Sequence, residues 1–313
     1  MPDRLAWVFP GQGAQEVGMG RDLFEGSGGA RRIFEAADRV LDFSVSKLCL
    51  EGPAEALQET RHAQPAIFTV SLACLEAARE LGGLNGAPVC AAGHSLGEYT
   101  ALVAAGALTL DDGLRLVAER GRLMQEAAER REGAMAALLG LDEDAAASVC
   151  RDTGAELCNV NAPGQIVIGG TSQAVEAAMT LALERGAQRG VRLKVGGAFH
   201  TSLMQPAAEG IARALADIPM RDPEVPVVAN TTAQPLTTAA ALRDELVRQL
   251  TGPVQWQRSV EALRALGVAG VIEFGPGRVL TGLARRIDRS LAVRNVNDIE
   301  SARSAAVALP APP

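Results

Sequence analysis

The chain has 313 residues, which is long enough for one large domain with an insertion or for two domains. Its formal charge of −7 argues against a nucleic-acid-binding protein, which normally shows a basic balance. No apolar run is long enough to span a bilayer, and the N-terminus lacks the basic and apolar segments of a secretory signal.

The five cysteines are odd in number, widely spaced and without a C-x-x-C pair. Such usage is typical of reduced thiols in the cytosol and gives no metal signature. We therefore expect a cytoplasmic protein with neither nucleic-acid nor membrane partners.

The first predicted element is a short buried strand at residues 5–9, which runs into the tight turn "PGQG". A second apolar strand at 88–93 precedes a segment of helical length and periodicity at 96–108. A long amphipathic helix follows at 110–131, and we expect Gly121 to loosen it. The alternation of strands and helices predicts a mainly parallel sheet.

The segment from 134 to 196 has a different pattern. Its elements are predicted in the order β-α-β-β-α-β, with an Asn-Ala-Pro-Gly turn between the two middle strands. This order is the ferredoxin-like pattern. We therefore expect a small subdomain at 133–196, inserted into a larger domain.

The larger domain is expected to comprise residues 1–132 and 197–313. Its second part contains two further predicted core strands, at 226–232 and 270–275. The final segment "ALPAPP" is expected to be disordered. The fold class is α/β.

Ser95 lies in "AAGHSLGEYTAL", at the junction between a predicted strand and a predicted helix. Gly93-x-Ser95-x-Gly97 in this context is the arrangement of a nucleophile elbow. The turn is so tight that the flanking residues must be small, and the following helix N-terminus directs N–H groups toward the serine. An ordinary glycine-rich turn is the alternative, but the strand and helix around it favour a nucleophile.

A nucleophilic serine needs a base, and the chain has only three histidines. His94 is adjacent to Ser95, and adjacent side chains diverge at a sharp turn, so we expect a structural role for it. His62 precedes a predicted helix and fits a surface or capping role. His200 follows the small subdomain and precedes a helix, which makes it the candidate base; a buried core histidine is the alternative.

A hydrolase triad would place an acid between the serine and the histidine in chain order. The acids available there lie on segments of the small subdomain that are predicted to be solvated: Asp142, Asp144, Asp152 and Glu184. None is a strong third member, and a main-chain carbonyl is an alternative partner for the histidine.

Six motifs occur in order: "FPGQGAQ", "GHSLGE", an arginine about one long helix later, "AFH", "PVQW" and "EFGPGRVLTGL". Together they resemble the malonyl-CoA:acyl carrier protein transacylases, which include the acyltransferase domains of polyketide synthases. The resemblance runs from about Leu5 to about Arg286 and implies an α/β-hydrolase-like domain with a ferredoxin-like subdomain. Because the chain begins shortly before the first motif, we expect a freestanding enzyme.

The resemblance also implies a Ser–His dyad. The nucleophile falls on Ser95, the base on His200, and the carbonyl that orients the histidine near Gln249. The two N–H groups of the oxyanion hole fall on Gln12 and Leu96.

Arg120 matches the arginine that binds the substrate carboxylate, and a guanidinium fork can hold a malonyl carboxylate bidentately. Its neighbour Arg122 is expected to face elsewhere on the helix. Phe199 gives the "GAFH" form, which in polyketide acyltransferases goes with malonyl. Further positions that tend to line the pocket of this family are Gln64, Met124, Asn161 and Val279.

The implied activity is ping-pong transfer of a malonyl group from malonyl-CoA, through a serine ester, to the phosphopantetheine thiol of an acyl carrier protein. It would serve fatty-acid or polyketide synthesis and need no metal or redox cofactor, and we expect a monomer. A serine hydrolase of acyl thioesters and a trans-acting acyltransferase with another extender unit remain alternatives. A catalytically dead carrier-protein-binding subunit is the non-enzymatic alternative.

Because carrier proteins are acidic, a local basic patch is expected to dock the partner. Two sets of side chains are candidates, with ordinary solvated arginines as the alternative for both. One lies near the C-terminus and comprises Arg278, Arg285, Arg286 and Arg289. The other lies on the small subdomain and comprises Arg189, Arg192 and Lys194.

Overall fold

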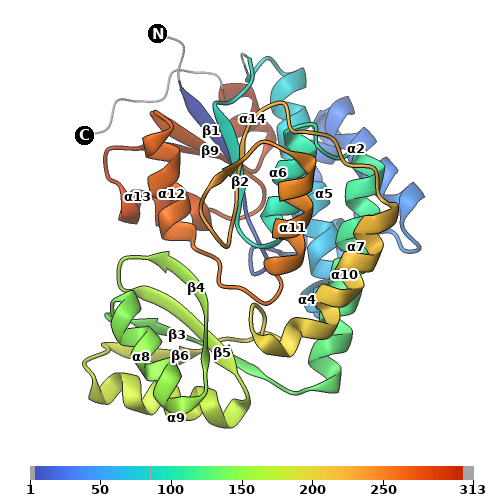
Figure 1. Ribbon diagram of the computed structural model, residues 1–313. Coiled ribbons are helices and arrows are strands. Elements are labelled where there is room, and N and C mark those ends of the chain that lie inside the picture. The colour runs from blue at the N-terminus through green and yellow to red at the C-terminus, as the bar shows by residue number, and fades with distance from the viewer. Residues whose placement is uncertain (1–3, 85, 306–313) are drawn as a thin grey trace.

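The computed structural model describes residues 4–84 and 86–305. The chain forms a large domain around one sheet and a small subdomain around another, which lies at one end of the molecule (Figure 1). The chain enters the small subdomain after the long helix α7 (Leu110–Arg130) and returns to the large domain before α10 (Gln205–Asp217). The predicted disordered tail lies outside the described residues.

The sheet of the large domain has the strand order β10-β9-β1-β2-β7-β8. Neighbouring strands from β10 to β7 are parallel, whereas β8 runs antiparallel to β7. The strands are β1 (Leu5–Phe9), β2 (Cys90–Gly93), β7 (Val227–Val228), β8 (Pro235–Leu236), β9 (Gly270–Phe274) and β10 (Ala292–Val296). The predicted mainly parallel sheet is confirmed.

Helices cover both faces of this sheet, as the burial of a parallel sheet requires (Figure 1). The other elements of the large domain are α1 (Arg21–Gly26), α2 (Gly28–Val40), α3 (Val45–Glu51), α4 (Ala54–Gln58), α5 (Thr60–Glu80), α6 (Leu96–Ala104), η1 (Ser202–Met204), α11 (Ala239–Arg248), α12 (Trp256–Ala265), α13 (Val279–Ile287) and α14 (Ile299–Ser304). Side chains of β1 alternate between the two faces, since successive strand residues point to opposite sides. Trp7 and Phe9 join the larger core, whereas Ala6 and Val8 pack with Trp256 on the other side.

The small subdomain is a four-stranded antiparallel sheet in the order β4-β5-β3-β6. Its elements are β3 (Ala134–Leu139), α8 (Glu143–Thr153), β4 (Glu156–Ala162), β5 (Gln165–Gly170), α9 (Ser172–Glu184) and β6 (Arg189–Arg192). The order along the chain is the ferredoxin-like pattern, and the two helices pack with the sheet around a separate apolar core. All these elements lie within the predicted range 133–196.

Gly121 does not loosen α7, which is continuous from Leu110 to Arg130. A Cβ at Gly121 would lie 2.9 Å from the carbonyl oxygen of Thr60 and 3.0 Å from the Cα of Arg61. The prediction was wrong because the glycine serves packing: it lets α5 approach α7 at backbone distance.

The predicted strand at 226–232 is much shorter in the structure, where β7 comprises only Val227 and Val228. The chain leaves the sheet there, because the side chain of Asn230 hydrogen-bonds the strand-to-helix turn that carries Ser95. The predicted helix at 96–108 likewise ends at Ala104.

β4 joins the small subdomain to the large one. The N–H of Val254 donates to the Cys158 carbonyl at 2.8 Å, and the N–H of Val160 donates to the Val254 carbonyl at 2.9 Å. On α13, Arg286 donates to the Pro163 carbonyl at 2.9 Å and to Gln165 at 3.3 Å. These contacts hold β4 and the β4–β5 turn against the large domain. Among the described residues, no helix is both long and apolar enough to cross a membrane.

Candidate active site

The candidate site lies at the carboxyl edge of the parallel sheet, where ligands of open α/β sheets bind. Ser95 follows β2, Gln12 follows β1, and Asn230 follows β7. Since β1 and β7 flank β2 in the sheet, three chain segments far apart in sequence meet around the serine. His200 and Arg120 come from the loop before η1 and from α7.

Ser95 occupies a strained turn. Its φ of 51° and ψ of −104° lie outside the regions that residues with side chains normally adopt. A Cβ at Gly93 would lie 1.8 Å from the Gly97 carbonyl carbon, and a Cβ at Gly97 would lie 2.0 Å from the Phe9 carbonyl oxygen. Only glycine fits at either position, so the motif meets the steric requirement of a nucleophile elbow.

His200 contacts the serine directly, with 2.7 Å between its Nε2 and Ser95 Oγ. Its Nδ1 lies 2.7 Å from the main-chain carbonyl oxygen of Gln249. A carbonyl only accepts hydrogen bonds, so Nδ1 carries the proton and Nε2 is free to accept the serine proton. The family resemblance implies an orienting carbonyl near Gln249, and the Gln249 carbonyl lies within hydrogen-bond distance of Nδ1.

Burial lowers the pKa of His200 to about 3, and the nearby positive charge of Arg120 adds to this effect. The imidazole is therefore neutral near neutral pH, which is the form that can accept a proton. His200 is 4% exposed and thus shielded from bulk water, whereas Ser95 is half-buried.

Arg120 points its guanidinium at the nucleophile from inside the protein, with 1% of the residue exposed. Its Nη2 donates to Ser95 Oγ at 3.0 Å, and its Nη1 donates to Gln64 Oε1 at 2.6 Å. The guanidinium carbon lies 5.0 Å from the centre of the Tyr99 ring, a cation–π distance. Burial lowers the pKa of Arg120, but an arginine stays charged at neutral pH.

A cavity of about 120 Å³ opens beside these groups. One water needs about 10–15 Å³ of such volume, so the space suits a short acyl group. Its lining comprises Gln12, His94, Ser95, Arg120, Met124, Met135, Asn159, Leu193, Val195, Phe199 and His200. Met124 and Phe199 thus face the cavity, and the small subdomain supplies part of its wall through Met135 and Asn159.

The segment before Gln12 passes against the elbow. A Cβ at Gly11 would lie 2.5 Å from the carbonyl oxygen of His94, so only glycine allows this approach. Leu96 is the first residue of α6, and amides in the first turn of a helix have no acceptor within the helix. Gln12 lines the cavity and Leu96 directly follows the serine, and their role as oxyanion donors stays a prediction.

Three expected pocket residues do not line the cavity: Gln64, Asn161 and Val279. Gln64 is fully buried and instead accepts a hydrogen bond from Arg120. Val279 is 53% exposed at the start of α13. Asn161 instead accepts a hydrogen bond from His94, with 2.9 Å between Nε2 and Oδ1. His94 thereby contacts the small subdomain, and its ring also lies 5.6 Å from that of Trp256.

The sequence reasoning missed three buried polar groups that hold the elbow. The side chain of Asn230 accepts from the Ser95 N–H and donates to the Gly93 carbonyl, both at 2.7 Å. Glu98 accepts from the Asn230 N–H at 3.0 Å. The Gln249 amide donates to the Ser95 carbonyl at 2.8 Å. A signal was available: Glu98 is a lone acid in a helix of small and apolar residues.

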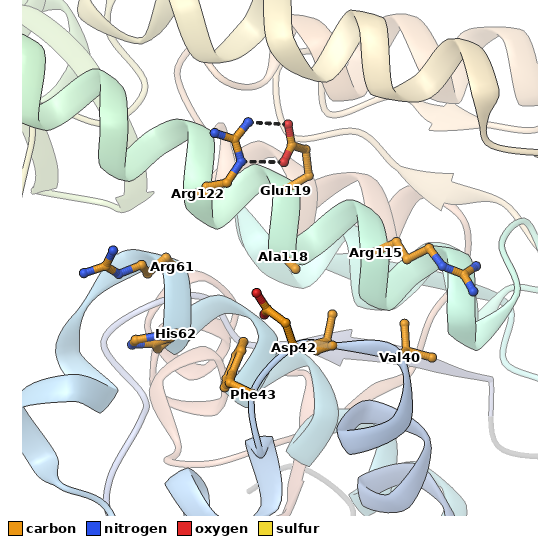
Figure 2. Close-up of a pocket in the computed structure, with 10 residues that line it drawn as sticks. Val40, Asp42, Phe43, Arg61, His62, Arg115, Ala118, Glu119 and Arg122 are labelled. Carbon is orange, nitrogen blue, oxygen red and sulfur yellow. Dashed lines mark hydrogen bonds and ion pairs between the residues drawn. The ribbon is translucent and has the colours of Figure 1, made fainter.

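A larger cavity, of about 770 Å³, lies elsewhere (Figure 2). It is lined by Phe43, His62 and residues on a different face of α7 from Arg120. Figure 2 shows Arg122 paired with Glu119, at 2.6 Å. Arg122 therefore faces away from the nucleophile, as its spacing predicts. His62 lies inside α5, with its Nδ1 3.1 Å from the Ala56 carbonyl oxygen, and takes no part in the Ser95 site.

Comparison with known proteins agrees with this geometry. The family described as "Acyl transferase domain" matches residues 6–308. The malonyl CoA-acyl carrier protein transacylase of Bacillus subtilis is 45% identical over 303 residues, which are 95% of each chain. The enzyme of the same name from Escherichia coli K12 is 44% identical over 98% of this chain and 99% of its own.

Solved structures are similar over the same length. An acyl carrier protein S-malonyltransferase from Vibrio cholerae has a TM-score of 0.92 and 42% identity, covering 96% of this chain and 98% of its own. A malonyl-transacylase in complex with its type II polyketide synthase acyl-carrier protein has a TM-score of 0.93 and 41% identity, covering 97% and 99%. With the whole chain matched and a Ser–His pair at the elbow, this protein belongs to the acyl transferase family, among the malonyl CoA-acyl carrier protein transacylases.

Proposed function

We propose that the protein transfers the malonyl group of malonyl-CoA to the phosphopantetheine thiol of an acyl carrier protein. The observation that carries the proposal is the buried guanidinium of Arg120, 3.0 Å from the nucleophile. A cation at that position selects an acyl group with a second, negatively charged end. The names of the similar proteins agree, since each specifies malonyl transfer to or from a carrier protein.

In the first half-reaction, Ser95 attacks the thioester carbonyl while His200 Nε2 takes its proton. The Gln249 carbonyl holds the opposite side of the imidazole at 2.7 Å and stabilises the imidazolium that forms. The N–H groups of Gln12 and Leu96 hold the oxyanion, and the loss of one such donor typically raises a barrier by about 3–4 kcal/mol. His200 then returns the proton to the departing CoA sulfur.

In the second half-reaction, the thiol of the carrier protein gives its proton to His200 and attacks the ester. Ser95 leaves as an alkoxide and takes the proton back from the imidazolium. No atom of a metal or redox cofactor enters this sequence of bonds. A carboxylate on Arg120 also offsets one of the causes that hold the pKa of His200 low, namely the positive charge of Arg120, so a bound malonyl group makes His200 a stronger base.

Hydrolysis is the competing outcome for the same ester. The base His200 is buried, which limits its access to water, and Arg120 would serve no purpose in a hydrolase of uncharged acyl chains. One chain holds every group of this mechanism, so we propose that it works as a monomer. We also propose that it acts in the cytoplasm, because all five cysteines are free and buried.

The two basic patches differ as docking sites for an acidic carrier protein. Arg286 already donates to Pro163 and Gln165, and Arg192 pairs with Glu176 at 2.7 Å. We propose that the exposed residues Arg285 and Arg189 carry more of the docking charge in their respective patches. Reversal of either charge should raise the KM for the carrier protein, whereas an unchanged KM would exclude that patch.

The proposed function is tested by a transfer assay. Purified protein is mixed with malonyl-CoA or acetyl-CoA and a phosphopantetheinylated acyl carrier protein, and acylation of the carrier is followed by mass. We expect transfer from malonyl-CoA to exceed transfer from acetyl-CoA by at least about 100-fold, since a buried cation without its partner costs several kcal/mol. Release of free malonate without carrier acylation would favour the hydrolase.

A further inference from the structure

Within residues 4–84 and 86–305, no carboxylate binds the guanidinium of Arg120 directly. Its two hydrogen-bonding terminal nitrogens contact Gln64, Ser95 and Gln249, all of them neutral. A buried cation is normally paired. Contacts other than a direct ion pair must therefore hold this charge in place before the substrate arrives.

The side chain of a buried glutamate lies one amide away, with its pKa raised by burial and by the nearby Glu245. Arg120 Nη2 donates to Gln249 Oε1 at 2.8 Å. On its other side, Gln249 Nε2 donates to Glu98 Oε2 and, at 2.8 Å, to the Ser95 carbonyl. Glu98 is 1% exposed, and Gln249 is fully buried. The chain of contacts runs from Glu98 through the Gln249 amide to Arg120.

The orientation of the Gln249 amide is fixed by its neighbours. An arginine can only donate, so the amide oxygen must face Arg120. The amide nitrogen must then face the Ser95 carbonyl and Glu98, which accept. Glu98 meets this demand because it has two acceptor oxygens, of which the other accepts from the Asn230 N–H at 3.0 Å.

We propose that Glu98 and the Gln249 side chain form a specificity relay: they hold the Arg120 guanidinium in position beside Ser95 and thereby set the preference for a carboxylated acyl group. The proposal rests on the proposed malonyl transfer and deepens it. It gives Gln249 two separate roles, since its main-chain carbonyl orients His200 while its side chain orients Arg120.

Buried glutamates near the relay differ in what they hold. Glu245 is also 1% exposed, but it accepts from the N–H and hydroxyl of Thr231, at 2.7 Å and 2.5 Å. Its side chain therefore holds a loop and, within the part of the chain that the structure describes, has no hydrogen bond to Arg120 or to the Gln249 side chain. The main-chain carbonyl of Glu245 accepts from the Gln249 N–H at 2.8 Å, a contact that a side-chain substitution leaves in place. This makes Glu245→Gln a matched control for the loss of one buried carboxylate.

Two variants break the relay and leave every main-chain group in place. Gln249→Met removes the amide but keeps the length of the side chain and the carbonyl that orients His200. Glu98→Gln keeps the shape of the side chain but replaces one of its two acceptor oxygens with an amide NH₂, which only donates. That NH₂ must face either the Gln249 amide nitrogen or the Asn230 N–H, and both of these are donors themselves. Single-turnover acylation of Ser95 by malonyl-CoA and by acetyl-CoA is measured for each, with Glu245→Gln and the unmodified protein alongside.

The relay predicts that both variants lower the malonyl-to-acetyl ratio of kcat/KM by at least about tenfold, mainly through a higher KM for malonyl-CoA. The ratio of Glu245→Gln should stay within about twofold of the unmodified protein. In an Arg120→Met background, Gln249→Met should change the ratio no further, because the group that it positions is gone.

Equal losses for both substrates, with an unchanged ratio, would contradict the relay and assign Glu98 and Gln249 to the stability of the elbow alone. Should Glu98→Gln fail to fold, Gln249→Met decides the question by itself. A failure of the proposed function is a separate result: the unmodified protein would then not be acylated by malonyl-CoA at all.

Discussion

The catalytic histidine has an environment that makes it a weak resting base. His200 has a left-handed φ of 62°, is 4% exposed, and lies close enough to Arg120 for the two charges to repel. Burial and that repulsion both favour the neutral imidazole. The backbone strain is consistent with a functional position, since such conformations persist only where the surrounding structure enforces them.

The pH dependence of acylation follows from this environment. The pKa of His200 is lowered from 6.5 to about 3, so the neutral base survives as the pH falls through 6.5. We expect the acid limb of kcat/KM for malonyl-CoA to lie well below pH 6.5, in a rapid-mixing pH series. The same lowered pKa has a cost for stability: as pH falls from 6.5 toward 3, the unfolded chain takes up this proton first, and the folded state loses stability.

Arg120→Met provides the control for this assignment. Removal of the positive charge takes away one cause of the lowered pKa, so the acid limb measured with acetyl-CoA should move to higher pH. An acid limb at pH 6.5 in the unmodified protein, or one that the substitution leaves in place, would contradict the electrostatic account.

At the scale of elements, the position of Arg120 depends on how closely α5 and α7 pack. Arg120 on α7 donates to Gln64 on α5, and Gly121 is the adjacent point of contact between the two helices. A side chain at that point would separate the helices. The position of the guanidinium beside Ser95 is therefore set partly by Gly121, which does not line the cavity.

Gly121→Ala tests this packing. Its Cβ would lie 2.9 Å from the Thr60 carbonyl oxygen, so we expect a loss of about 1–3 kcal/mol in the free energy of unfolding. The matched control is Gly282→Ala in α13, where no atom lies within 4 Å of the added Cβ, and where alanine should stabilise by up to about 1 kcal/mol. Denaturant unfolding of both variants is the measurement. A similar change in the free energy of unfolding for the two variants would show that the close contact between Gly121 and Thr60 does not affect stability.

At the scale of the whole molecule, the site lies where the small subdomain contacts the large domain. β4 contacts the large domain through Val254 and His94, and the β4–β5 turn contacts it through Arg286 on α13. The small subdomain also lines part of the cavity. The reacting groups of the large domain thus depend on the small subdomain to complete their enclosure.

Arg286→Ala tests the contacts between α13 of the large domain and the β4–β5 turn of the small subdomain. The substitution removes the hydrogen bonds to Pro163 and Gln165, so we expect faster amide hydrogen exchange in the β4–β5 turn, with little change elsewhere. Arg285→Ala, at an exposed neighbouring position, is the control and should leave exchange unchanged. Equal exchange in the two variants would mean that the Arg286 contacts do not restrain the turn.

Much of this arrangement could be predicted from the sequence, because short-range rules govern it. The glycines around Ser95 follow from the tight turn, and the β-α-β-β-α-β order follows from periodicity. The side chains of Asn230, Glu98 and Gln249 could not be predicted in the same way. Their roles depend on contacts across the sheet between residues up to 154 positions apart, and periodicity carries no information about such pairs. Gly121 was misjudged for the same reason: its partner lies on another helix.

The central claim is that Ser95 carries a malonyl group during the reaction. The most direct test is intact-mass measurement after brief incubation of the protein with malonyl-CoA in the absence of carrier protein. The account predicts a gain of one malonyl group on the unmodified chain, no gain on Ser95→Ala, and loss of the group when carrier protein is added. No gain on the unmodified chain, or an equal gain on Ser95→Ala, would contradict it.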